Sequence, residues 1–173
     1  WVQRAQQVKG VNKLVLLDPA GAKSEFAIKH AATNTNHFLL TDQESFAKFY
    51  ELSMQKPPFM PPSVLRYLGQ TNYIDKYQQY EHMFADFFDP ELFFDEALFK
   101  QDEDTNPPKA LVIWGEKDEL LLWEPQKERI INDLNLYDNN IHLIDAKHFL
   151  QEEKPEKING FIFDFLAKNA RSN

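Results

Sequence analysis

Three short, mostly apolar runs recur along the chain, at positions 13–17, 110–114 and 141–144. A continuous apolar run of this length is typical of a strand whose two faces are both buried, as they are in parallel sheets. A loop with polar residues follows each run. Because open α/β sheets bind their ligands beyond the carboxyl ends of the strands, we expect the functional residues to lie in these three loops.

Two amphipathic helices are predicted beside the last two strands. One begins with Pro155, and the other begins near Pro125 and ends before the turn-forming segment 137–140. The positions expected to face the core are Ile158, Phe161, Ile162, Phe165 and Leu166 in the first, and Ile130, Ile131 and Leu134 in the second. Strands and helices therefore alternate, as the α/β class requires.

Between positions 22 and 106 the strand pattern gives way to aromatic residues at helical spacing. Thr41 and Glu44 are expected to form a capping box, the prolines of 57–62 to end that helix, and Ser63 to cap the next one. The positions predicted to share one helix face are Phe46, Phe49 and Tyr50, then Val64, Tyr67 and Leu68, then Tyr80, Met83, Phe84, Phe87 and Phe88. We interpret this stretch as a helical insertion.

The pattern divides the chain into three parts. Residues 1–21 are expected to form the end of a helix and the core strand after it, 22–106 the helical insertion, and 107–173 the C-terminal core segment. Three parallel strands with few helices cannot cover both faces of a sheet, so we expect strands from elsewhere to complete it. Residues 1–8 have the pattern of a helix end without its own N-cap, which predicts a chain cut within a helix.

The composition is that of an ordinary globular protein, with 43% hydrophobic and 27% charged residues among 173. The net charge of -8 and the scattered basic residues argue against a nucleic-acid partner, which needs a concentrated positive patch. No cysteine is present, so neither disulfides nor thiolate metal sites are expected. No apolar run approaches the ~20 residues of a membrane span. We expect a soluble protein, with the compartment open and the cytoplasm favoured.

Asp118 and His148 are the strongest candidates for chemistry, because each follows the apolar run of a predicted strand. Such a pair is the acid and the base of nucleophile-His-acid hydrolases, in which the carboxylate orients the imidazole and stabilises its charged form. Taken singly, an aspartate or histidine of this kind is more often an ordinary loop residue. No Gly-x-Ser-x-Gly motif and no cysteine supplies a nucleophile within the chain.

Four segments carry a resemblance to a known family: KLVLLDPAG at 13–21, KPPFMPPSVLRYL at 56–68, PKALVIWGEKD at 108–118 and HFLQEEKP at 148–155. With them the chain resembles the C-terminal part of the α/β-hydrolase superfamily, and more narrowly its bacterial lipase and monoacylglycerol lipase group. The resemblance covers essentially the whole chain. It implies a partial α/β-hydrolase fold, made of the last parallel strands and helices of the sheet with a helical cap insertion.

The resemblance also implies a Ser-His-Asp triad, with Asp118 as the acid and His148 as the general base. The serine is expected upstream of Trp1, in an elbow that also contributes to the oxyanion hole. The implied reaction is hydrolysis of a small apolar carboxylic ester, such as a monoacylglycerol, without a cofactor. Asp18 is a second-ranked candidate acid, because some α/β-hydrolases place the carboxylate after that strand. The family usually has glycine where this chain has Lys147.

The prolines at 57–58 and 61–62 enclose two apolar residues, Phe59 and Met60. We expect both to be exposed and to contact the substrate or a lipid surface. The aromatic stripes around them are compatible with a lid and also with the core of a helical subdomain. No metal site is expected, because the acidic residues at 102–104 lack the spacing of a calcium loop.

Two alternatives stay open. An aspartate nucleophile would make the protein a haloalkane dehalogenase or an epoxide hydrolase, relatives that the HFLQEE segment also resembles. A chain without nucleophile and oxyanion donors would instead be an inactive fragment or a non-enzymatic module. The residue at the elbow discriminates between the two chemistries, because it determines which covalent intermediate forms.

Overall fold

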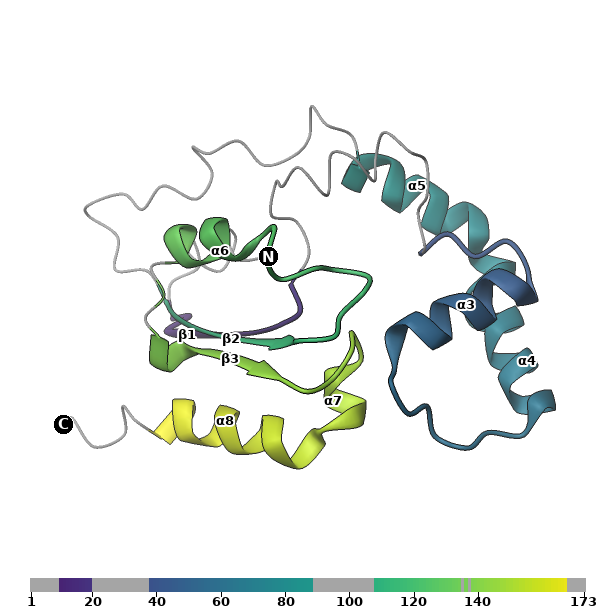
Figure 1. The fold of residues 1–173 in the computed structure, drawn as a ribbon. Coiled ribbons are helices and arrows are strands. Elements are labelled where there is room, and N and C mark those ends of the chain that lie inside the picture. The colour runs from purple at the N-terminus through teal and green to yellow at the C-terminus, as the bar shows by residue number, and fades with distance from the viewer. Residues whose placement is uncertain (1–9, 20–37, 89–107, 135, 137, 168–173) are drawn as a thin grey trace.

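The computed structural model describes residues 10–19, 38–88, 108–134, 136 and 138–167. Figure 1 shows a small sheet with helices on both sides and a group of helices beside it. We call these the sheet region (10–19 and 108–167) and the helical region (38–88). The predicted helix end at 1–8 lies outside the described residues, and the division into three parts stays a prediction. None of the described helices has the length and apolar character needed to cross a membrane.

Three parallel strands form the sheet: β1 (Lys13–Leu17), β2 (Lys109–Gly115) and β3 (Ile141–Ile144). β2 lies between the other two. The three strands predicted from the apolar runs are therefore confirmed. Because they are parallel, the loops after β1, β2 and β3 all leave the same edge of the sheet.

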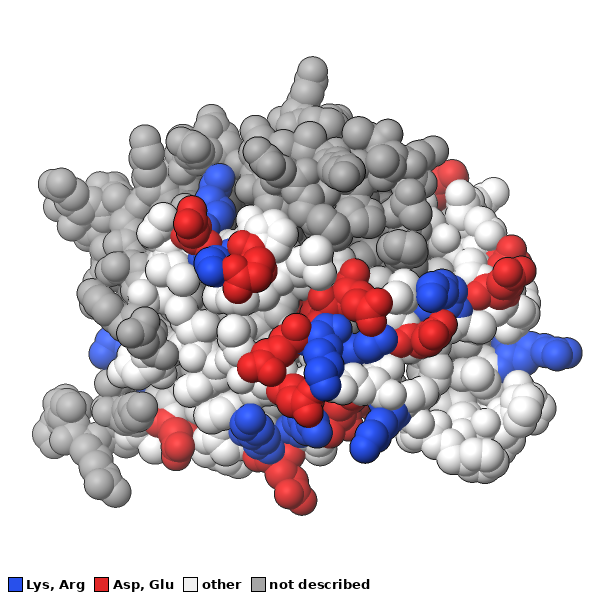
Figure 2. All heavy atoms as spheres, in the orientation of Figure 1, with Lys and Arg blue, Asp and Glu red and all other residues white. Residues whose placement is uncertain are grey.

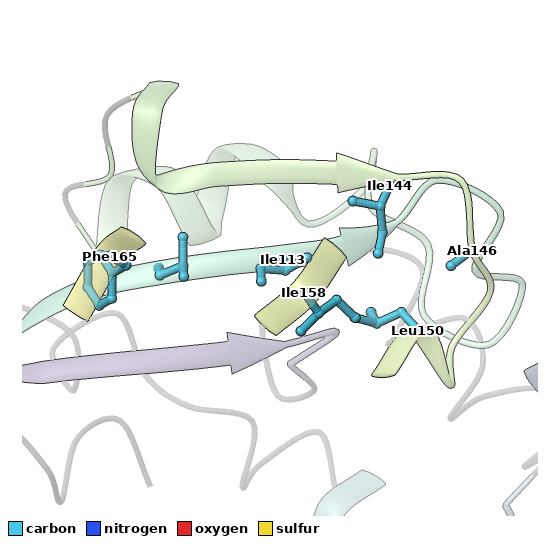
Figure 3. Close-up of a cluster of buried hydrophobic side chains, with 7 residues drawn as sticks. Ile113, Ile144, Ala146, Leu150, Ile158 and Phe165 are labelled. Atoms are coloured by element: carbon cyan, nitrogen blue, oxygen red, sulfur yellow. The ribbon is translucent and has the colours of Figure 1, made fainter. Parts of the chain in front are cut away.

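The central strand β2 is buried on both faces, because a helical layer covers each of them (Figure 1). On one face, Ile113 packs against α7 (Leu150–Glu153) and α8 (Pro155–Ala167), as Figure 3 shows. On the other face, Val112 and Trp114 pack against α6 (Lys127–Asp133). The expectation that so few helices could not cover both faces is wrong for β2, while all of β1 is only half-buried. That strands from elsewhere complete the sheet stays a prediction.

The helices of the sheet region begin at or near the predicted positions. α8 begins at Pro155, and α6 begins just after Pro125, with the short 3-10 helix η3 (Asp138–Asn140) before β3. Ile158 and Phe165 are buried, but Leu166 is 48% exposed, so its predicted core position is wrong. At about 100° per residue, Phe165 returns to within about 20° of Ile158 around the helix, whereas Leu166 is rotated by about 80°.

The helical region contains α3 (Gln43–Ser53), α4 (Pro62–Asn72), the 3-10 helix η1 (Ile74–Lys76) and α5 (Tyr77–Phe88). The N-cap of α3 is Asp42, whose carboxylate accepts the Ser45 N–H at 2.8 Å. The Ser45 hydroxyl accepts the Asp42 N–H at 3.1 Å in return. The predicted capping box of Thr41 and Glu44 is therefore wrong by one position, because a carboxylate is the better acceptor at the positive end of a helix.

α4 starts without a side-chain cap. It begins at Pro62, with Pro61 in the N-cap position, so the cap predicted at Ser63 is wrong. A proline in the first turn has its φ angle already set for the helix and needs no partner for an N–H that it lacks. The second pair of prolines therefore starts α4, whereas α3 already ends at Ser53, before the first pair.

Aromatic rings hold the helical region together. Phe46 and Phe49 of α3 are buried, and Leu65 of α4 packs against the same cluster. Gly69 of α4 lies directly on the Phe46 ring, since a Cβ built there would be 2.5 Å from a ring carbon. That close approach decides which face of α4 is turned inward.

The predicted inward face of α4 is partly wrong for this reason, and that of α5 is also partly wrong. Val64 and Tyr67, expected to line up with Leu68, are 43% and 65% exposed, and Met83 of α5 is 48% exposed. Tyr80 and Phe84 of α5 do share a face, with ring centroids 6.4 Å apart. The side chains of residues 87 and 88 lie outside the described part.

Candidate active site

Asp118 lies in the loop after β2, which we call the β2 loop (116–121). Its N–H donates to the Gly115 carbonyl at 3.1 Å, which turns the chain back toward the strand end. Its Oδ1 accepts the N–H groups of Leu120 and Leu121 at 2.8 and 2.9 Å. The side chain is fully buried, so the backbone fixes the carboxylate in one orientation.

His148 lies in the loop after β3, which we call the β3 loop (145–149). Its Nδ1 is 2.8 Å from Oδ2 of Asp118, and its side chain is 16% exposed. An ionised carboxylate only accepts hydrogen bonds, so Nδ1 carries the proton and Nε2 is left as the basic nitrogen. The structure therefore brings the two predicted residues together, with the geometry of an oriented imidazole.

The β2 and β3 loops touch at Gly115. A Cβ at this position would lie 2.5 Å from the carbonyl oxygen of Lys147 and 2.6 Å from that of Ala146. Lys147 itself needs no unusual backbone angle, because Asp18 is the one non-glycine residue of the described part with a positive φ. The glycine that permits close loop packing is thus Gly115, one strand away from the position that the resemblance indicated.

Sequence reasoning missed a group of polar residues around the pair. Lys147 Nζ lies 2.7 Å from Glu119 Oε1, which joins the β3 loop to the β2 loop. Lys117 Nζ lies 2.6 Å from Asp145 Oδ1 and 2.9 Å from the Gln55 side-chain oxygen. Figure 2 shows charges of both signs gathered where the sheet and helical regions meet. No periodic signal could have identified these residues, because they come from separate loops.

Asp18, the second-ranked candidate acid, lies beside the pair but is bonded elsewhere. It is 4% exposed, and its Oδ1 accepts the Gly115 N–H at 2.8 Å. Its Oδ2 has no hydrogen-bond partner among the described residues. The pKa of the Asp18 carboxyl is raised to about 8. Burial is the main cause, the charge of Asp118 adds to the rise, and the Gly115 hydrogen bond offsets part of it. Asp118, and not Asp18, is the carboxylate in contact with His148.

One side-chain oxygen or nitrogen atom from each of Asp18, Asp118 and His148 lies within 4.8 Å of the others, which is close enough for the three to bind one metal ion. Both oxygens of Asp118 already accept hydrogen bonds, and Nδ1 of His148 faces that carboxylate. A cation bound here would have to displace these hydrogen bonds, and Asp18 would offer it only one carboxylate oxygen without a hydrogen bond. The donor set suits an oriented acid-base pair better than a metal ion.

A pocket of about 770 Å³ lies next to the β2 loop. Its walls come from the end of α3 and from both loops: Ala47, Tyr50, Glu51, Met54, Gln55, Pro57, Glu116, Lys117, Asp118, Glu119, Leu122 and Lys147. Phe59 and Met60 do not line it. Phe59 is 95% exposed, as predicted, whereas Met60 is half-buried, contrary to the prediction. Their contact with substrate or lipid stays a prediction.

No family model matches the chain. A curated relative, Lipase 3 of Moraxella sp. (strain TA144), is 28% identical over 136 residues, which are 75% of this chain and 40% of the relative. The solved structure of a membrane phospholipase A, described as a bacterial virulence factor, has a TM-score of 0.77 at 19% identity, over 95% of this chain and 52% of its own.

A protein of Acinetobacter baumannii AYE, described as a candidate lipase, has a TM-score of 0.72 at 19% identity, over 95% of this chain and 56% of its own. The chain thus spans less than half of the curated relative and about half of each solved structure. At such low identity the structural likeness shows the fold alone. The described strands and helices therefore correspond to one part of a larger architecture.

Proposed function

We propose that this chain, which has the fold of the C-terminal part of an α/β-hydrolase, contributes the acid and the base of a Ser-His-Asp triad that hydrolyses carboxylic esters. The observation that supports this most directly is the 2.8 Å contact between His148 Nδ1 and Asp118 Oδ2. The nucleophilic serine is proposed to lie upstream of Trp1 in a longer protein. Similarity to a protein named as a lipase supports the ester class.

The proposed mechanism assigns each proton to a named atom. Nε2 of His148 takes the proton of the serine hydroxyl as its oxygen attacks the ester carbonyl, and later gives that proton to the leaving alkoxide. Asp118 keeps Nδ1 protonated and stabilises the imidazolium that forms in between. The two backbone N–H groups on Oδ1 fix the orientation of the Asp118 carboxylate. This chemistry draws on no cofactor.

The proposed substrate is an ester with an apolar acyl group. Three observations support it: the Phe38 and Phe149 rings lie 6.0 and 5.8 Å from the His148 ring, Phe59 is almost fully exposed, and two similar proteins are described as a lipase and a phospholipase. Apolar walls beside the base would bind an acyl chain and keep water from the imidazole. Phe59 and Met60 remain our candidates for contact with the substrate or with a lipid surface.

A serine-reactive fluorophosphonate and a short-chain nitrophenyl ester test the proposal on the full-length protein. We expect labelling of the wild type, and a fall in kcat/KM of about 10⁶-fold in His148→Ala and about 10⁴-fold in Asp118→Asn. His82→Ala, which changes an exposed histidine of α5, serves as the matched control and should keep full activity. Turnover of haloalkanes or epoxides without labelling would favour an aspartate nucleophile instead. Neither labelling nor turnover would leave an inactive or non-enzymatic protein.

A further inference from the structure

The carboxyl end of α3 is capped by the two residues that flank His148. The last carbonyls of a helix have no partner within the helix. Here the Glu51 carbonyl accepts from Lys147 Nζ at 2.9 Å, and the Ser53 carbonyl accepts the Phe149 N–H at 2.9 Å. A lysine at this end also complements the negative end of the helix dipole. His148 is therefore held between two attachments to the same helical turn.

Glu153 of α7 adds a third attachment through a single carboxylate. Its Oε1 accepts the Lys147 N–H at 2.8 Å, and its Oε2 accepts the Gln55 N–H at 3.0 Å. One carboxylate thus joins the backbone of the β3 loop to the backbone just after α3. Hydrogen bonds to an ionised acceptor are shorter and stronger than neutral ones, so this bridge restrains both segments.

Buried side chains surround this joint. Ser53 is completely buried, and Phe49 beside it is 4% exposed. The Phe49 ring contacts the Phe149 ring edge-on, with centroids 5.8 Å apart. Because Ser53 is fully buried, the hydrogen bond from the Phe149 N–H to its carbonyl is electrostatically stronger than one on the surface. The Glu153 bridge is part-buried and lines a pocket of about 540 Å³.

The exposed ion pair between the β2 and β3 loops contributes less. Lys117 and Asp145 have side chains that are 55% and 61% exposed, and exposed pairs of this kind add little to rigidity. Lys147 is 16% exposed in its side chain and bonds through both its N–H and its Nζ. The partly buried bridge at Glu153 therefore restrains the β3 loop more than the exposed pair of Lys117 and Asp145 does.

We propose that Glu153 is a positioning residue: by bridging the Lys147 and Gln55 N–H groups, it sets the place of the His148 imidazole from the helical region. The expected effect of Glu153 on the reaction rate rests on the proposed function. The existence of the Glu153 bridge does not depend on that function. It follows that a shift of the end of α3, for example when a ligand fills the adjacent pocket, moves the general base. The helical region then regulates catalysis through the β3 loop as well as covering the site.

Glu153→Gln tests the proposal in the full-length protein, with Glu152→Gln as the matched control. The glutamine keeps the volume but offers one acceptor oxygen instead of two, so one N–H loses its partner. We expect kcat for the ester to fall about 10- to 100-fold with KM nearly unchanged, since a small displacement of the base acts on the chemical step. The exposed Glu152 next to it should tolerate the same change without loss.

Backbone hydrogen exchange supplies a readout that needs no activity. At least one of the N–H groups of Lys147 and Gln55, the one that loses its acceptor, should exchange about 10-fold faster or more in Glu153→Gln than in Glu152→Gln. Faster exchange with unchanged kcat would overturn the positioning role and leave the hydrolase proposal intact. Unchanged exchange would show that Glu153 does not bridge the two segments. If the wild type hydrolyses no ester, the proposed function is wrong, and the exchange rates still test whether the bridge exists.

Discussion

The two regions of the molecule are stabilised by different kinds of side chain. Mostly aliphatic residues fill both faces of the sheet, where Val112 and Ile113 are fully buried, with Trp114 on one face and Phe165 on the other. Aromatic rings take their place in the helical region, where Phe46 lies 5.5 Å from the Tyr73 ring and 6.0 Å from the Tyr50 ring. Both regions also leave large apolar side chains on the surface, such as Phe59 in the helical region, 95% exposed, and Phe163 in the sheet region, 71% exposed. The two regions therefore differ in the side chains that fill their cores and not in whether apolar surface remains exposed.

The two regions also contribute differently to the candidate site. Asp118 and His148 both belong to loops of the sheet region, whose tight core fixes their strands. The helical region contributes no member of the pair, but Phe38 lies 6.0 Å from the His148 ring and the end of α3 holds the β3 loop. The proposed acid and base thus lie in the sheet region, and the proposed substrate contacts and the proposed control of the base in the helical region.

The largest expected effect is a dependence of stability on pH, caused by Asp18 of the sheet region. The pKa of Asp18 is raised from 3.8 to about 8, so its contribution to stability is fully present below about pH 4 and is lost as pH rises through about 8. Between these limits the free energy of unfolding should fall by up to about 1.4 kcal/mol per pH unit. Urea unfolding at several pH values measures it.

Asp18→Asn is the test of that assignment. Asparagine can accept the Gly115 N–H and tolerates the positive φ of 38° at this position, but it does not titrate. The decline toward pH 8 should therefore disappear in the variant, while Asp164→Asn on the exposed face of α8 should retain it. An identical pH profile in wild type and Asp18→Asn would contradict the raised pKa.

A substitution in the sheet core should cost more than one on the surface of the helical region. Trp114 is fully buried, and its Nε1–H donates to the Leu121 carbonyl at 2.9 Å. We expect Trp114→Ala to lower the free energy of unfolding by about 3–5 kcal/mol. Phe59→Ala should change it by less than about 0.5 kcal/mol. Denaturant unfolding measures both, and a large loss in Phe59→Ala would show that this ring is part of a core.

Gly69→Ala tests the close packing within the helical region. The new Cβ would lie 2.5 Å from the Phe46 ring, which must then move, at a cost of about 1–3 kcal/mol. Gly160→Ala in α8 is the matched control, because nothing lies within 4 Å of its Cβ position. There alanine should stabilise the helix by about 0.5–1 kcal/mol. Thermal unfolding that shows equal effects would argue against the α3–α4 contact.

The smallest expected effect concerns the start of α3. Ser45→Ala removes the hydroxyl that accepts the Asp42 N–H, and should destabilise the protein by about 0.5–1 kcal/mol. Ser63→Ala should have no measurable effect, because no side chain caps α4. If Ser63→Ala were the more damaging of the two in urea unfolding, the observed helix starts would be wrong.

The strands were predictable because a parallel strand buried on both faces needs apolar residues at nearly every position. Helix faces were less predictable. Val64 and Tyr67 fit an inward stripe by spacing, yet the contact of Gly69 with Phe46 turns them outward. A glycine carries no hydrophobic signal, so only packing shows that it lies at the closest approach.

For the candidate site, the sequence by itself determined that Asp118 and His148 each follow a strand, because each lies just beyond an apolar run, and the structure made those two strands neighbours. Only the tertiary structure decided that they touch, that Gly115 lets their loops pack, and that Glu153 bridges the β3 loop to α3. Periodic patterns record which face of an element is buried. A contact such as that of Gln55 with Glu153 joins residues far apart in the chain, and no local pattern encodes that distance.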